Sequence, residues 1–202
     1  MKKIEQYLPR LRVVGCALIV LLAVGSCASK PKGPPESVDN ICTIFAERPE
    51  WRATVEASAL RWGAPVDVQM AILWQESGFR PKARAPKRYL AGFVPWGRAS
   101  SAYGYAQAID GTWDWYRQET GNRGARRSDF EDAADFVGWY MAKTLVLNNV
   151  PMRDAYHQYL NYHEGHTGYR RGDWQNKDWL KAAANRVASQ AALYRMQLAS
   201  CP

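Results

Sequence analysis

The sequence of 202 residues lacks the motifs of several common enzyme classes. It has no Ser-His-Asp order of a hydrolase triad, no phosphate-binding loop and no glycine pattern of a dinucleotide site. Its apolar run at residues 13–24 is shorter than the about 20 residues that a permanent membrane-spanning helix needs. No internal repeat is visible. These absences exclude triad hydrolases, nucleotide-binding folds, repeat proteins and a permanent membrane span at this run.

Histidine is scarce, and the three that are present lie close together, at His157, His163 and His166. With Glu164 they have the side chains that bind zinc, but their spacing fits no common zinc motif. We therefore expect them on the surface or in a groove, and we expect neither a metal nor another cofactor.

Strand patterns are also few, and helix signals dominate. Pro49 and Gly63 have the spacing of a helix that starts at proline and stops before glycine. A capping box, Ser128-Asp129-Phe130-Glu131, begins a long helix whose core face is predicted to hold Phe130, Ala134, Val137 and Met141. Asp110 is predicted to cap another helix. Further helices are predicted over residues 66–78, 110–121, 152–163 and 178–200, so the fold class is mainly α.

The N-terminus has the pattern of an export signal. Basic residues precede the apolar run, and Gly25 and Ser26 lead to Cys27. This ending resembles the lipobox of bacterial lipoproteins, in which the cysteine is lipidated, although Val24 stands where leucine is usual. We expect residues 1–26 to be a signal peptide; the alternative is ordinary cleavage that leaves a spare thiol at Cys27.

Residues 27–40 are rich in proline and poor in apolar side chains, so they are predicted to be a flexible tether. Ala28 after the lipidated position resembles sorting to the outer membrane. The sequence thus predicts a periplasmic protein that is attached to a membrane through its N-terminal lipid. It leaves the oligomeric state open.

Two further cysteines, Cys42 and Cys201, lie at the two ends of the remaining chain, residues 41–202. In an exported protein such a pair is expected to form a disulfide; the alternative is two free buried thiols. The formal net charge is +8, and about +5 remains without the signal peptide, whose four basic residues and one glutamate contribute +3. A basic surface suits peptidoglycan, an anionic membrane or a nucleic acid.

Glu76 is the strongest candidate for chemistry. It lies in the last turn of a predicted helix, beside the apolar stripe that contains Leu73. Partial burial and the negative end of the helix dipole both raise the pKa of a carboxyl group there. A raised pKa is what a general acid needs near neutral pH, whereas a solvated glutamate at a helix end would have no such role.

Three short motifs follow in order. They are Glu76-Ser77-Gly78-Phe79, Gly104-Tyr105-Ala106-Gln107 and Tyr162-His163-Glu164-Gly165. They resemble the Glu-Ser-Gly, Gly-Leu-Met-Gln and Ala-Tyr-Asn-Ala-Gly motifs of lytic transglycosylases with a goose-type-lysozyme-like domain, known as the SLT domain. The resemblance covers about residues 41–202 and implies a single lysozyme-like helical domain.

The resemblance also implies roles. Glu76 would protonate the oxygen between MurNAc and GlcNAc and then deprotonate the C6 hydroxyl, which gives 1,6-anhydro-MurNAc. Ser77 and Gln107 would contact the sugar, Gly104 would let the backbone approach it closely, and Tyr162 would orient Glu76. Tyr105, His163 and Glu164 belong to the same predicted glycan-binding set. Peptidoglycan strands are the expected partner.

Several departures indicate a divergent branch of the family. His163 and Glu164 replace asparagine and alanine, and Tyr105 and Ala106 replace leucine and methionine. An insertion around residues 87–98 is basic and aromatic; it either lines the groove or is a surface feature.

Rival functions stay open. Glu164 could be a second catalytic carboxylate, which would make the protein a muramidase, and a third alternative is a non-catalytic peptidoglycan-binding lipoprotein. Residues 169–174 have the mixture of a nucleic-acid site, but export argues against that partner.

Overall fold

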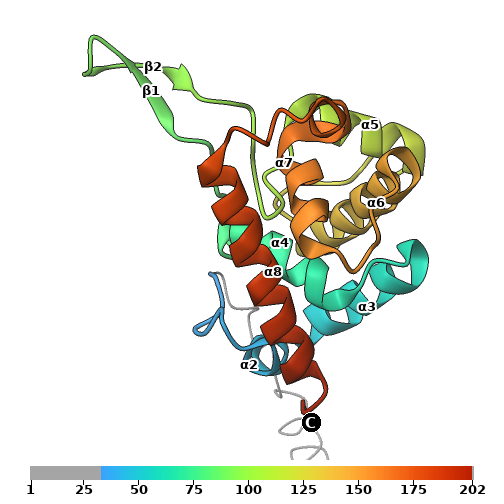
Figure 1. Ribbon diagram of the computed structural model, residues 1–202. Coiled ribbons are helices and arrows are strands. Elements are labelled where there is room, and N and C mark those ends of the chain that lie inside the picture. Colours follow the sequence, from blue (N-terminus) through green and yellow to red (C-terminus); the bar gives the residue numbers. More distant parts are fainter. Residues whose placement is uncertain (1–32, 202) are drawn as a thin grey trace, which may run out of the picture. The chain divides into compact units, whose positions relative to one another are not determined.

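Seven helices and one β-hairpin follow one another along residues 33–201, the part of the chain that this computed structural model describes (Figure 1). The predicted mainly α fold is confirmed. The predicted signal peptide and Cys27 lie outside the described residues. The elements are α2 (Ile41–Glu47), α3 (Pro49–Trp62), α4 (Val66–Ser77), β1 (Lys87–Leu90), β2 (Val94–Arg98), α5 (Asp110–Thr120), α6 (Phe130–Asn148), α7 (Ala155–Arg171) and α8 (Asp178–Leu198).

Proline and glycine set the ends of the first helices, as predicted. Pro49 is the first residue of α3, and Gly63 ends the helix in the left-handed conformation at φ 72°. Gly78 ends α4 in the same way at φ 56°, directly after the Glu76-Ser77 pair. Glycine is suited to this C-terminal position because it has no Cβ. The position of Glu76 in the last turn of its helix is therefore set by local sequence.

The predicted capping residues of two helices are wrong. Asp110 does not cap α5, because its carboxylate forms an ion pair with Arg127 at 2.8 Å. The capping residue of α6 is Asp129 and not Ser128; the Asp129 side chain accepts from the backbone N–H of Glu131. At α6 the capping side chain is one residue later than predicted. At α5 the predicted capping side chain is engaged by an arginine.

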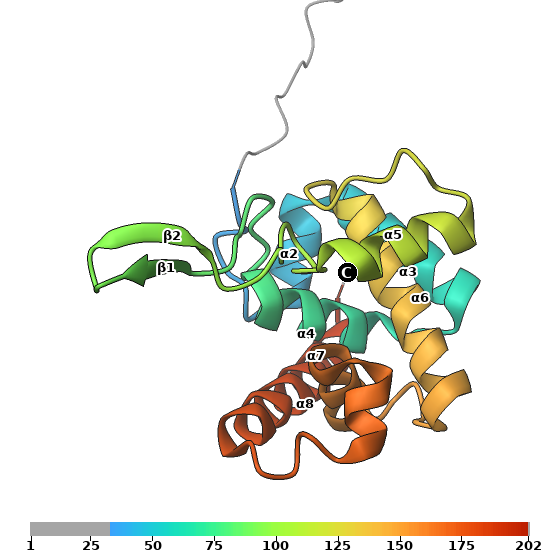
Figure 2. The same cartoon turned by 90° about the horizontal axis from the view of Figure 1, so that it is seen from above.

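Helix α7 is longer than the predicted 152–163, because it continues to Arg171 through a break at Gly165. Helix α2 and the hairpin of β1 and β2 were not predicted. The hairpin is antiparallel and pairs Lys87 with Arg98 and Leu90 with Val94. Seen from above, it projects as an arm from the helical body (Figure 2).

Helix α6 lies at the centre of the helical body, where it packs against α3, α4, α5 and α7, while the long helix α8 packs across α4 and α7 (Figures 1 and 2). All four residues predicted for the core face of α6, from Phe130 to Met141, are buried. Trp51 of α3 stacks on Phe130 with ring centroids 3.9 Å apart, and Tyr105 meets both rings edge-on. Much of the aromatic content thus serves the core.

A disulfide joins Cys42 to Cys201, which confirms the predicted pair. It spans a sequence separation of 159 residues and ties α2 to the end of α8. Residues 33–202 cluster as one compact unit, and this unit contains its own core and its own disulfide. We therefore expect it to fold when it is produced alone. None of the helices within residues 33–201 is long and apolar enough to cross a membrane.

The part of the expected tether that the structure describes is attached to the helical body. Arg48 donates to the carbonyl of Gly33 at 3.1 Å, and the Gln197 amide donates to the carbonyl of Asp39 at 3.1 Å. The Tyr194 hydroxyl donates to the carbonyl of Val38. Residues 33–40 are irregular, as their prolines predict, but these bonds hold them. The flexible tether predicted over 27–40 therefore does not include residues 33–40.

Candidate active site

A pocket of about 490 Å³ lies where α4 ends and α7 breaks. Glu76 from α4, Phe136 and Tyr140 from α6, and residues from the chain on either side of the hairpin form its walls. All its lining residues are Glu76, Ala85, Pro86, Ser100, Ala102, Gln107, Ala108, Ile109, Thr112, Phe136, Tyr140, Tyr162, His163, Glu164 and Gly165. The pocket thus brings together one residue or more from each of the three sequence motifs.

Glu76 is half-buried in this pocket. Burial raises the pKa of its carboxyl group from 4.5 to about 7, and a hydrogen bond from Tyr159 offsets part of that rise. Glu76 forms no ion pair within residues 33–201. The expected raised pKa is confirmed, and near neutral pH the group is present both as an acid and as a base.

The tyrosine that bonds to Glu76 is Tyr159 and not Tyr162, which corrects the sequence prediction. The Tyr162 hydroxyl donates instead to the carbonyl of Ala106 at 2.6 Å. Burial raises the pKa of both phenols, so both remain protonated donors at neutral pH. Tyr159 lies three residues before Tyr162, on the same face of α7. This spacing could have revealed it.

Tyr162 joins the third motif to the second. Its bond to Ala106 holds the segment before Gln107 against α7. Gln107 adopts φ 48°, and its side-chain amide donates to the carbonyls of Ala83 and Gly104 at 3.0 and 2.7 Å. Both N–H groups of that amide are then used, which leaves its oxygen as the free hydrogen-bonding group. Gln107 can therefore accept a hydrogen bond from a ligand hydroxyl or amide.

Helix α7 breaks at Gly165, which adopts φ 74° and ψ 156°. This conformation is accessible almost only to glycine. The Tyr140 hydroxyl of α6 donates to the carbonyl of Asn161, one turn before the break, at 3.1 Å. Gly165 lines the pocket, so the break places backbone rather than a helix face at its wall.

Glu164 has very different surroundings from Glu76. Its side chain is only 6% exposed, and both of its oxygens accept from the ammonium of Lys177, at 2.8 and 2.7 Å. His163 lies beside it, with Nδ1 3.3 Å from a carboxylate oxygen. The ring of His163 in turn meets Trp179 edge-on at 5.0 Å. This wall of the pocket therefore combines a paired carboxylate with an exposed imidazole.

Comparison with known protein families supplies the assignment. A family model described as "Transglycosylase SLT domain" matches residues 15–201. The chain belongs to this family. No curated protein matches the sequence. An SLT domain acts on peptidoglycan, which is therefore the substrate class of this chain, and its predicted family is confirmed.

Within this SLT domain, Ser77 is not placed to contact a sugar, contrary to the prediction. Its side chain is buried, with 1% of the residue exposed, and its hydroxyl donates to the carbonyl of Leu73 at 3.2 Å. The serine follows Glu76 on the helix and so points toward a different side, into the core. It stabilises the last turn of α4 instead.

Gly104 and Tyr105 of the second motif are also core residues rather than sugar contacts. Gly104 adopts φ 81°, and a Cβ added there would lie 1.8 Å from the carbonyl oxygen of Arg127. The close approach that requires glycine is therefore to the protein's own backbone. Tyr105 is buried between Trp51 and Phe130. Of this motif, Gln107 alone lines the pocket.

The three histidines of the SLT domain point to separate partners. His157 bonds to the Tyr169 hydroxyl at 2.9 Å, His163 lies at the pocket, and His166 bonds to Thr144 at 3.1 Å. Burial lowers the pKa of His166 to about 4, so it is neutral at physiological pH. Within residues 33–201 no three His, Cys, Asp or Glu side chains form a group that could hold a metal ion.

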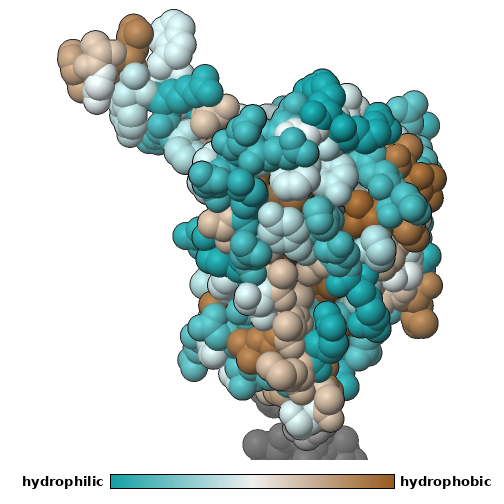
Figure 3. Space-filling model, in the orientation of Figure 1, coloured by the Kyte–Doolittle hydropathy of each residue, from teal (hydrophilic) through white to brown (hydrophobic). Residues whose placement is uncertain are grey.

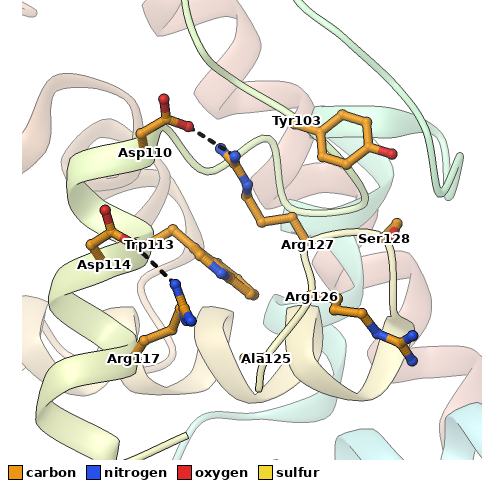
Figure 4. A pocket seen from close by; sticks show the side chains of 9 residues that line it. All are labelled: Tyr103, Asp110, Trp113, Asp114, Arg117, Ala125, Arg126, Arg127 and Ser128. Atoms are coloured by element: carbon orange, nitrogen blue, oxygen red, sulfur yellow. Dashed lines mark hydrogen bonds and ion pairs between the residues drawn. The ribbon is translucent and has the colours of Figure 1, made fainter. Parts of the chain in front are cut away.

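A second cavity, of about 460 Å³, lies beside α5 and is drawn in Figure 4. Its two central arginines are paired: Arg127 with Asp110 at 2.8 Å, and Arg117 with Asp114 at 3.3 Å. Arg127 also donates to the carbonyls of Ser101 and Ala108, at 3.1 and 2.8 Å. This arginine therefore fixes both ends of the second SLT motif and has a structural role.

Proposed function

We propose that this SLT domain is a lytic transglycosylase with Glu76 as its single catalytic acid and base. The observation that carries this proposal is the position of Glu76 in the pocket that all three motifs reach, where burial raises the pKa of its carboxyl group to about 7. A carboxyl group with this pKa can give up a proton and take one back without a second catalytic carboxylate.

In the proposed reaction, Glu76 first donates its proton to the oxygen between MurNAc and GlcNAc, and the β-1,4 bond breaks. The substrate's own N-acetyl group stabilises the positive centre that forms. The Glu76 carboxylate then takes the proton of the C6 hydroxyl, whose oxygen closes onto C1 to give 1,6-anhydro-MurNAc. Tyr159 would hold the carboxylate through both steps. Gln107, Tyr162, His163 and Glu164 line the pocket and would contact the sugars.

The rival reaction, in which water attacks and the protein is a muramidase, would need a second carboxylate as base or nucleophile. Glu164 is the candidate in this pocket. Both of its oxygens accept hydrogen bonds from the ammonium of Lys177, so the carboxylate is held by the protein and is not directed at a water or a sugar carbon. The ion pair therefore favours the transglycosylase over the muramidase.

We also propose that the domain works outside the cytoplasm. An export signal over residues 1–26, lipidation at Cys27 and attachment to the outer membrane follow from the sequence alone. The disulfide between Cys42 and Cys201 supports an oxidising compartment such as the periplasm.

The test is digestion of purified sacculi with the unit 33–202, followed by mass spectrometry of the muropeptides. Wild type is expected to release products with anhydro ends, which are lighter than reducing ends by one water. Glu76→Gln is expected to release none, while Glu164→Gln, as the matched control, is expected to release the same anhydro products as wild type.

Two other outcomes would contradict the proposal. Reducing ends that depend on Glu164 would assign the muramidase reaction. Binding of sacculi without any cleavage by a folded protein would make the domain a glycan-binding module.

A further inference from the structure

The segment between the first two motifs has a one-sided charge. Residues 77–109 contain no aspartate and no glutamate. The same segment contains six basic residues: Arg80, Lys82, Arg84, Lys87, Arg88 and Arg98. A stretch whose charges are all positive is suited to an anionic surface.

The hairpin within this segment separates charge from apolar side chains along its length. The basic residues Lys87 and Arg98 pair across the strands at the end that joins the body, and Arg88 follows Lys87. The apolar pair Leu90 and Val94 closes the far end. Exposed apolar side chains thus gather at the tip of the arm, and the basic side chains lie at its attached end, next to the body (Figure 3).

The tip is unusually exposed. Phe93 is 76% exposed and Trp96 is 70% exposed, and Tyr89, Leu90 and Val94 are exposed as well. Every residue of both strands is exposed, so neither face of the hairpin packs on the helical body. Such side chains in water cost free energy unless something covers them.

The positive charges at the attached end of the arm are not neutralised by acidic side chains of residues 33–201. Lys87, Arg88 and Arg98 form no ion pair with any acidic side chain of residues 33–201. Arg98 donates to the carbonyl of Ala85 at 2.7 Å, which fixes its direction without cancelling its charge. The charges are therefore free to act on an anionic partner.

We propose that the hairpin is a membrane-binding arm. Its apolar tip would be inserted into an anionic lipid surface, and the basic side chains of its attached end would lie at the headgroups. Tryptophan and tyrosine favour the interface between hydrocarbon and water, and lysine and arginine favour anionic headgroups. A glycan platform would instead place its aromatic rings on one face along the groove. Here the exposed aromatic residues Tyr89, Phe93 and Trp96 belong to the hairpin. The hairpin is an arm that points away from the body (Figure 1).

This arrangement would hold the pocket close to the membrane. Ala85 and Pro86, just before β1, and Ser100, just after β2, line the pocket of Glu76. Of the two alternatives for the insertion, lining the groove or forming a surface feature, the structure supports the second for both strands, since only flanking residues line the pocket. The proposal does not depend on which reaction Glu76 performs, since it concerns lipid binding by the arm.

The test is sedimentation of the unit 33–202, which lacks the export signal and Cys27, with vesicles of phosphatidylglycerol and phosphatidylethanolamine, and with vesicles of phosphatidylcholine alone. We expect binding to the anionic vesicles that falls as salt is raised. The double variant Phe93→Ser/Trp96→Ser should bind at least about tenfold more weakly. Lys87→Gln/Arg88→Gln should lose roughly fivefold per charge at low salt.

The matched control is Leu60→Ser/Val146→Ser, which removes two equally exposed apolar side chains from other surfaces and should bind vesicles like wild type. Unchanged thermal unfolding of all variants would show that they are folded. The proposal is overturned if the Phe93→Ser/Trp96→Ser variant binds vesicles as wild type does. It is also overturned if wild type binds no anionic vesicles. Loss of binding to sacculi by the tip variant would in that case make the arm a peptidoglycan contact.

Discussion

Two walls of one pocket contain the same kind of side chain in opposite surroundings. At the end of α4, Glu76 has a phenol as its hydrogen-bond partner and forms no ion pair with the described residues, and its pKa is raised to about 7. At the break of α7, Glu164 has the ammonium of Lys177 at both of its oxygens. Burial without a cation therefore gives Glu76 a pKa suited to a proton donor, whereas Glu164 is engaged on both oxygens by a cation.

The largest expected effect follows from exchanging each carboxylate for its neutral amide. Glu76→Gln should lower kcat/KM on sacculi by about 10³-fold or more, because the proton donor is lost. Glu164→Gln should lower it less than about tenfold, because the chemistry does not pass through that group. Rates of soluble muropeptide release would measure both. Equal losses in the two variants would show that Glu76 and Glu164 contribute equally to the reaction.

A smaller effect is expected when the cation is taken from Glu164. Lys177→Met leaves a mostly buried carboxylate without its ammonium partner and with only the His163 imidazole beside it, and should lower the free energy of unfolding by about 2 kcal/mol. The double variant Glu164→Gln/Lys177→Met should recover most of that loss. Urea denaturation at neutral pH measures all three proteins. A Lys177→Met protein as stable as wild type would show that the ion pair does not hold this wall.

Stability should also depend on pH through Glu76. Its folded-state pKa of about 7 lies above the ordinary value of 4.5, so the folded protein holds the proton more tightly than the unfolded chain. The ionised form therefore costs stability, and the cost grows from about pH 4.5 to pH 7 and is complete above that. Glu76→Gln should be more stable than wild type by about 1–3 kcal/mol at pH 8. At pH 4 thermal unfolding should not separate the two proteins.

The smallest predicted effect concerns the phenol beside Glu76. The bond from Tyr159 lowers the pKa of Glu76, so Tyr159→Phe should move the alkaline limb of the kcat/KM profile upward by about one pH unit. Tyr162→Phe is the matched control, because its hydroxyl bonds to Ala106 and not to the carboxylate. A shift caused by Tyr162→Phe instead would restore the role that the sequence motif implied for Tyr162.

The sequence predicted the helices best where the signals are local. Pro49, Gly63 and Gly78 fix helix ends through their own backbone preferences, and those ends are correct. The start of α5 at Asp110 is correct as well, but the capping role predicted for Asp110 is wrong because its side chain pairs with a distant residue, Arg127, that no local pattern reveals. The hairpin was missed because its strands are exposed on both faces and so show no alternation of apolar and polar residues.

For the site, the order of the motifs predicted which segments meet but not which side chains face the pocket. Glu76 and Ser77 are neighbours, yet one lines the pocket and the other bonds within the core. Gly104 is fixed by the backbone of Arg127, a contact over a long stretch of chain. Such directions depend on tertiary packing, so a motif identifies a family more securely than it identifies ligand contacts.

The link between Cys42 and Cys201 has a consequence for protease digestion. The exposed hairpin at residues 87–98 is the natural place for a protease to cut. Both ends of the domain are joined by the disulfide, so one cut there opens a ring and releases no fragment. A nicked protein would therefore keep its full mass under non-reducing electrophoresis and separate into two pieces only after reduction.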